Sequence, residues 1–204
     1  PNADDLFIDF QKLVAEHNGH SSLIELGSRA RSGNTYKQHF PTLDQYTGVD
    51  ISPGDNVDLV GDLHQLSKAV NQRYDFALSI SVFEHLLMPW VAATELNKSL
   101  KLGGIAYIQS HPAYPLHDEP WDFFRFSKEA WRGLFNHLTG FEVLSTAYSL
   151  PANIVPAHAM DGPLQGIDRN TTYLISACLV RKISDPEVDW SCNPSSIYDL
   201  GYSH

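Results

Sequence analysis

Three acidic residues stand near the ends of three successive apolar segments in the first third of the chain. Glu25 lies two residues before Gly27 in an apolar run, and Asp50 and Asp62 end the next two runs. Buried parallel strands read as continuous apolar runs, and ligands bind beyond their carboxyl ends in open α/β sheets. Asp50 also lies near the offset of about 20 residues at which a carboxylate binds ribose hydroxyls. Each acid alone is explained equally well as a strand tip or turn residue, but together they predict a nucleotide-type site.

Three histidines follow later apolar runs and could transfer a proton. His85 comes after the run 74–81, and His111 and His117 come after the run 105–109. Imidazole is the usual general base near neutral pH, so each is a candidate catalytic residue toward a hydroxylated acceptor. We favour His117 as the base, although each histidine is also explained as a satisfied structural residue.

The segment 110–127 has the composition of a substrate lid. Its three prolines exclude a continuous helix or central strand. Its aromatic rings and hydrogen-bonding groups suit a sugar-like acceptor, whereas a small apolar acceptor would need fewer polar groups. The alternative is a packed structural loop in which Arg125 pairs with Asp122 to hold the loop closed. The candidate acceptor-binding residues are Tyr114, Asp118, Trp121, Asp122 and Arg125.

Alternating strands and helices must position these groups. Apolar spacing predicts an N-terminal helix over 4–17 within the segment 1–20. Further helices are expected over 34–40, over 90–101 with Gly103 and Gly104 closing it, and from the cap Ser127 to 138. Strands are expected over 23–26, 46–51, 57–62, 74–81, 105–109, 141–148 and 173–180. This alternation predicts an α/β fold with a doubly wound, mostly parallel sheet.

Composition limits the remaining function classes. The 204 residues, 43% of them apolar, fit a single domain over 1–183 followed by a polar tail over 184–204. A net charge of -10 argues against nucleic acid as a partner. No apolar run reaches the roughly 20 residues that span a bilayer, so no membrane association is expected. Two cysteines do not make a disulfide framework, and we expect a cytoplasmic protein.

Together these segments resemble a class I S-adenosylmethionine-dependent methyltransferase of the group called type 11. The resemblance rests on the order and spacing of segments 24–29, 46–51, 57–62, 79–85 and 100–104. It implies a Rossmann-like sheet of seven strands with helices on both faces, an antiparallel last strand beside the fifth, and S-adenosyl-L-methionine as cofactor. The segment 115–127 is similar to a pattern of relatives near sugar and glycan biosynthesis. The expected reaction is therefore O-methylation of a small hydroxylated acceptor, such as a sugar or glycan precursor.

The resemblance also implies where the cofactor binds. Glu25 and Gly27 would border its methionine end, Asp50 would hold the ribose hydroxyls, and Asp62 would contact the adenine amino group. Arg29 stands where the family usually has the second glycine of a Gly-x-Gly turn. The expected cofactor-binding residues are Glu25, Gly27, Ser28, Arg29, Asp50, Ile51, Asp62, Leu63 and Ser81.

Two other functions fit the same residues. One is a cofactor-binding or scaffold protein that keeps this fold without turnover, and the other is a nicotinamide-dependent oxidoreductase. Glu25 disfavours the second, because a carboxylate is poorly suited beside a pyrophosphate. Glu84-His85 is similar to a metal-linked motif of some relatives, but further ligands are not evident, so no required metal is expected. The oligomeric state is not predicted.

Overall fold

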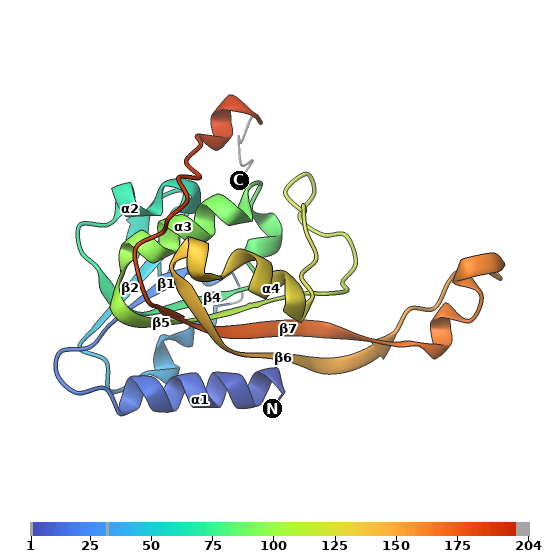
Figure 1. The fold of residues 1–204 in the computed structure, drawn as a ribbon, viewed down its shortest axis with the longest axis horizontal. Helices are drawn as coiled ribbons and strands as arrows, with labels where there is room; N and C mark the ends of the chain where they lie inside the picture. The colour runs from blue at the N-terminus through green and yellow to red at the C-terminus, as the bar shows by residue number, and fades with distance from the viewer. Residues whose placement is uncertain (1, 32, 199–204) are drawn as a thin grey trace.

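A computed structural model describes residues 2–31 and 33–198, whereas 1, 32 and 199–204, which include the end of the expected tail, lie outside the described residues. These residues form a seven-stranded sheet (Figure 1). The strands are β1 (Ser22–Leu26), β2 (Gln45–Asp50), β3 (Leu59–Val60), β4 (Tyr74–Ile80), β5 (Leu100–Ser110), β6 (Phe141–Asn153) and β7 (Thr171–Lys182). Their order is β3-β2-β1-β4-β5-β7-β6, with β7 antiparallel to both of its neighbours and the first five strands parallel. The predicted mixed sheet with an antiparallel last strand is confirmed.

The helices cover both faces of the sheet, as Figure 1 shows. On one face α1 (Ala3–Ala15) begins at a capping box between Asn2 and Asp5 and buries Leu6, Phe10 and Val14. Short α2 (Leu66–Ala69), α3 (Pro89–Ser99) and α4 (Lys128–Leu134) lie on the other face. Two separate apolar clusters result, one on each side of the sheet. Within the described part of the chain, no helix is both long and apolar enough to cross a membrane.

Three predicted boundaries are wrong for local reasons. β3 has two residues rather than six. The Gly48 N–H donates to the side-chain carboxylate of Asp58 rather than to a backbone carbonyl, so regular strand pairing begins only after Asp58. Gly103 does not close α3. The helix ends at Ser99 because Leu100 is buried in extended conformation, and Gly103 lies inside β5 with φ of 81°. The helix capped by Ser127 ends early at Leu134.

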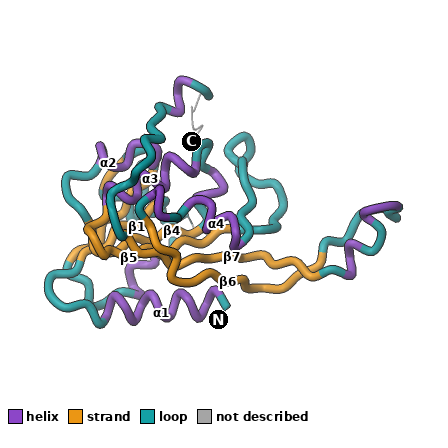
Figure 2. Tube along the Cα trace, viewed as in Figure 1, coloured by secondary structure: helices purple, strands orange, loops and turns teal. Residues whose placement is uncertain are grey.

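The two antiparallel strands run further than the sequence predicts. Pairing of β6 with β7 continues to Asn153 and Thr171, beyond the expected strand bounds 148 and 173. Figure 2 shows this ladder leaving the body of the molecule as an arm, with short 3-10 turns at its tip. The short helix expected over 34–40 is a 3-10 helix, over Tyr36–His39.

Candidate active site

A cavity of about 590 Å³ opens at the carboxyl ends of β1, β2, β3, β4 and β5. This edge includes the point where strand order reverses between β1 and β4, as expected for ligand binding in a doubly wound sheet. Seven of the nine expected cofactor-binding residues line it: Gly27, Arg29, Asp50, Ile51, Asp62, Leu63 and Ser81. The cavity also contains all three candidate histidines, His85, His111 and His117.

The turn after β1 requires a glycine. Gly27 has φ of 73°, and a Cβ added there would lie 2.2 Å from Val82 Cγ2. The N–H groups of Gly27 and Ser28 both donate to the Val49 carbonyl, at 2.8 and 3.0 Å. Because Gly27 has no side chain, its backbone lines the cavity directly in this tight turn.

Glu25 and Ser28 do not line the cavity. The Glu25 carboxylate accepts hydrogen bonds from Tyr46 Oη at 2.5 Å and from Asn56 Nδ2 at 2.8 Å. Burial raises the pKa of Glu25, and these two hydrogen bonds offset only part of that rise. Glu25 is thus bound within the protein, and its contact with the methionine end of a cofactor stays a prediction.

The Glu25→Gln variant is expected to become more stable relative to the unchanged chain as the pH rises above about 4.5. A carboxyl whose folded pKa is raised makes the folded state bind more protons, so stability falls as pH rises from the unfolded pKa through the folded one. The glutamine variant lacks this loss. Urea unfolding of both proteins across that window measures the difference. Glu129→Gln, at an exposed site, is the matched control. If the difference in unfolding free energy between the Glu25→Gln variant and the unchanged chain did not depend on pH, the raised pKa of Glu25 would be contradicted.

Asp50 and Asp62 are held rigidly at the cavity edge. The Asp50 carboxylate accepts backbone hydrogen bonds from Arg29 at 3.2 Å and from Ser52 at 3.0 Å. Asp62 accepts hydrogen bonds from the N–H and ring Nδ1 of His64, at 2.9 and 2.7 Å. Burial raises the pKa of Asp62, but the two His64 hydrogen bonds outweigh it and the net shift is downward. His64 lines the cavity too. Sequence reasoning missed it, although Asp-x-His is the spacing of an Asx turn.

Each of the three candidate histidines has one ring nitrogen fixed by a backbone carbonyl. Because a carbonyl only accepts, each Nδ1 carries a proton, and in the neutral form of each ring it is Nε2 that has the lone pair. The Nε2 of His111 lies 3.2 Å from the hydroxyl of Ser81, which follows β4 with φ of 55°. The carbonyl partners are Trp121 for His85 at 2.6 Å, Leu174 for His111 at 2.8 Å, and Pro115 for His117 at 3.1 Å.

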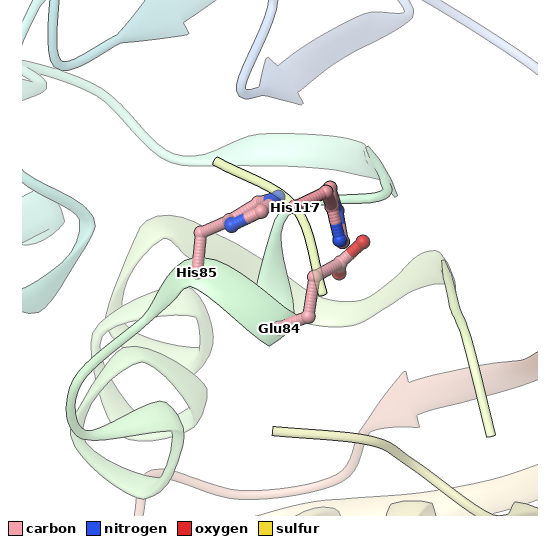
Figure 3. A group of neighbouring side chains, drawn as sticks. All are labelled: Glu84, His85 and His117. Atoms are coloured by element: carbon pink, nitrogen blue, oxygen red, sulfur yellow. The ribbon is translucent and has the colours of Figure 1, made fainter. Parts of the chain in front are cut away.

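Glu84 is a fully buried carboxylate beside these histidines. Its Oε2 accepts a hydrogen bond from Ser110 Oγ at 2.6 Å. Its Oε1 has no hydrogen-bond partner among the described residues and lies 3.5 Å from His111 Nε2. Figure 3 shows Glu84, His85 and His117 converging from the turn after β4 and from the loop after β5. The sequence placed Glu84 beside His85, but the fold alone brings His117 to them.

The predicted lid is a loop, and it divides the candidate acceptor residues into two sets. Tyr114, Asp118 and Trp121 line the cavity, whereas Asp122 and Arg125 do not. Arg31, which the sequence reasoning missed, also lines it and forms a 2.7 Å ion pair with Asp118. That guanidinium lowers the pKa of Asp118.

Arg125 holds the lid closed, which is the structural role expected as the alternative. It donates to both Asp122 carboxylate oxygens, at 2.5 and 2.7 Å. It also donates to the carbonyls of Tyr114, Pro115 and Phe124. All five guanidinium N–H groups are thereby used. The Arg125 guanidinium holds the pKa of Asp122 well below its usual range.

The C-terminal tail returns to the outside of this loop. The Tyr198 ring lies 5.3 Å from the Trp121 ring and 5.9 Å from the Phe123 ring, both edge-on. The tail therefore packs on the lid at Tyr198.

Residues 26–108 match a protein family described as a methyltransferase domain. No curated protein matches the chain. Among solved structures, a SAM-dependent methyltransferase from Archaeoglobus fulgidus has a TM-score of 0.57 and 12% identity, covering 89% of this chain and 95% of its own. The N-methyltransferase NodS from Bradyrhizobium japonicum, solved with S-adenosyl-L-homocysteine, has a TM-score of 0.56 and 13% identity, covering 89% and 88%. The candidate methyltransferase complexed with the Trm112 activator of Haloferax volcanii has a TM-score of 0.55 and 18% identity, covering 89% and 92%.

The solved structures share the fold, and the matched segment contains the turn at Gly27 together with Asp50, Asp62 and Ser81. The fold class predicted from the sequence is confirmed by these matches. Residues 26–108 thus match a methyltransferase domain, and the chain has the fold of the class I S-adenosylmethionine-dependent methyltransferases.

Proposed function

We propose that this protein catalyses S-adenosylmethionine-dependent O-methylation of a small hydroxylated acceptor, such as a sugar or glycan precursor. The observation that carries the proposal is a single cavity that unites the carboxylates at the ends of β2 and β3 with three imidazoles whose Nε2 atoms keep their lone pairs. The first set suits a nucleoside cofactor, and the second suits proton removal from a hydroxyl.

The cavity residues fit the cofactor by their chemistry. Asp50 has a carboxylate fixed by two backbone N–H groups, which is suited to accept hydrogen bonds from ribose hydroxyls. Asp62 and Leu63 follow the neighbouring strand β3 at the same edge of the sheet, where the adenine amino group is expected. When bound, the cofactor supplies a methyl group on a positively charged sulfur. The chain itself must align that group with the acceptor, and orientation of this kind can lower a barrier by about 7–11 kcal/mol.

The lid provides the acceptor side of the cavity. Tyr114 and Trp121 offer flat apolar surfaces, and Asp118 offers a carboxylate that is already paired with Arg31. An imidazole Nε2 of this cluster accepts the hydroxyl proton as the oxygen is methylated, a contribution of roughly 10²–10⁴-fold in rate. The aromatic and charged lining supports a polar acceptor over a purely apolar one.

Replacing Asp50 by asparagine is expected to weaken binding of S-adenosylhomocysteine by roughly 1–3 kcal/mol, because one hydroxyl acceptor is lost in a partly buried site. Calorimetric titration measures the change. The unchanged chain should also melt at a higher temperature with this ligand. Asp44→Asn is the matched control. Asp44 lies just before the first residue of β2, outside the cavity, and its carboxylate accepts a hydrogen bond from the Ser21 N–H.

The same titration separates this proposal from its competitors. Glu25 does not line the cavity, so its carboxylate gives no argument against a nicotinamide cofactor, and NAD belongs in the experiment as a third ligand. Binding of NAD with no binding of S-adenosylhomocysteine would contradict the proposal. Cofactor binding without methyl transfer to any hydroxylated acceptor would favour the scaffold function.

A further inference from the structure

We infer that Glu84, His85 and His117 form a binding site for one divalent transition-metal ion in the wall of this cavity. Each residue offers one ligand atom, and the three atoms lie within 4.8 Å of one another. The three side chains come from two segments that are distant in sequence and point toward a common space (Figure 3). This inference departs from the sequence expectation that no metal is required.

The histidines are oriented in the way that metal-binding histidines usually are. Such residues almost always donate the second ring N–H to a carbonyl or carboxylate, which fixes the tautomer and the ring orientation. His85 does so to the Trp121 carbonyl, and His117 to the Pro115 carbonyl, with Asp122 Oδ2 also 3.4 Å from the same nitrogen. In both, the Nε2 lone pair remains for a cation.

The carboxylate gives an independent indication. Glu84 is 0% exposed, and a buried carboxylate oxygen without a partner is costly unless a cation or a donor satisfies it. Ser110 binds only Oε2, which leaves Oε1 without a hydrogen bond. The 3.5 Å from Oε1 to His111 Nε2 is longer than the roughly 2.7–2.9 Å of a charge-assisted hydrogen bond. Oε1 is therefore left for a metal ion.

The ligand set selects the kind of ion. Two imidazoles and one carboxylate suit Zn²⁺, Fe²⁺ or Co²⁺, whereas Mg²⁺ and Ca²⁺ prefer oxygen ligands alone. Ligands about 2.1 Å from a tetrahedral ion lie roughly 3.4 Å apart, so binding draws the three side chains together. Three protein ligands leave a position for water or an acceptor oxygen, as in catalytic zinc sites.

A metal ion here would deepen the proposed function, on which this step rests. An acceptor hydroxyl bound to the ion would lose its proton more readily, as metal-bound water does. His117 would then be a ligand rather than the base. His111, which lines the same cavity with its Nε2 lone pair, would be the remaining imidazole that can take the proton.

Metal binding is tested directly on the untagged chain after treatment with a chelator. Titration with Zn²⁺ in competition with a chromophoric chelator is expected to give one ion per chain and a higher melting temperature. Glu84→Gln and His117→Ala should each weaken Zn²⁺ binding at least tenfold, while Mg²⁺ should not compete. His20→Ala, which removes an exposed histidine outside the cavity, is the control and should change nothing. Circular dichroism establishes that each variant is folded.

The outcomes distinguish this inference from the proposed function. Less than one Zn²⁺ per chain, or equal affinity in the Glu84→Gln and His117→Ala variants, would overturn the metal site. Loss of Zn²⁺ affinity in His111→Ala, with affinity unchanged in Glu84→Gln and His117→Ala, would also overturn it, because the ion would then be held by His111 at another site. S-adenosylhomocysteine binding is measured on the same samples. Zn²⁺ binding without cofactor binding would contradict the proposed function and leave the metal site standing.

Discussion

Replacing Trp131 by alanine is expected to lower the free energy of unfolding by about 3–5 kcal/mol, the usual loss when a large aromatic side chain is removed from a core. Trp131 is fully buried in α4 and stacks on Phe126 with ring centroids 4.6 Å apart. Its indole N–H donates to Ser176 Oγ at 3.1 Å. The substitution therefore leaves a cavity and removes a buried hydrogen bond. Urea unfolding measures the loss.

Trp90→Ala is the matched control for this change. Trp90 lies at the start of α3 and is 39% exposed, so its removal should cost less than about 1.5 kcal/mol. Trp131→Phe keeps an aromatic ring against Phe126, so it should lose less stability than Trp131→Ala. Equal losses for Trp131→Ala and Trp90→Ala would contradict the core role assigned to Trp131.

Replacing Arg125 by leucine is expected to lower the free energy of unfolding by about 2–4 kcal/mol, because it leaves the Asp122 carboxylate without its cation. The Asp122 side chain is 0% exposed and that of Arg125 only 23% exposed. Since the pKa of Asp122 is lowered, this stabilisation is complete above about pH 4 and is lost as pH falls through the lowered value. Urea unfolding at neutral and acidic pH measures both effects.

Two further variants test that assignment. Arg132→Leu removes an exposed ion pair with Glu129 on α4 and should cost less than about 1 kcal/mol. Asp122→Asn, combined with Arg125→Leu, should recover part of the loss, because no unpaired charge then remains. A loss that the second substitution does not reduce would show that Arg125 acts through its contacts with the Tyr114 and Pro115 carbonyls instead.

The cavity edge could be predicted because it depends on the ends of buried strands. Asp50 and Asp62 end apolar runs, and in a parallel sheet such ends meet at one edge regardless of loop detail. Both residues line the cavity. Fold class and this part of the site therefore follow from local patterns.

Side-chain partners that come from distant segments could not be predicted in the same way. Glu25 turns to Tyr46 and Asn56, which the pairing of β1 with β2 and the turn after β2 bring to it. His117 reaches Glu84 because the lid folds back, as its Phe123 and Phe124 N–H groups donate to the Glu84 carbonyl. No sequence spacing encodes either contact.

At the end of α3, tertiary packing overrides the local sequence preference. Two consecutive glycines favour a helix stop, yet α3 ends before them because Leu100 pairs with Tyr74 and is fully buried. Gly103 instead serves a bulge at the start of β5, where the pairing with β4 shifts register. The free energy by which glycine disfavours continuing a helix is smaller than the free energy gained by burying a leucine side chain.

The position of β7 sets the order in which the sheet can be completed as the chain is synthesised. β5 pairs with β7 and not with β6, so its outer edge has no neighbour until the chain has been made through β7, residues 171–182. An unpaired strand edge is a template for pairing with other chains. The β6–β7 hairpin has the more local contacts and can form first, after which it docks on β5 as a unit. The hazard of aggregation during synthesis is therefore concentrated in the interval before that docking.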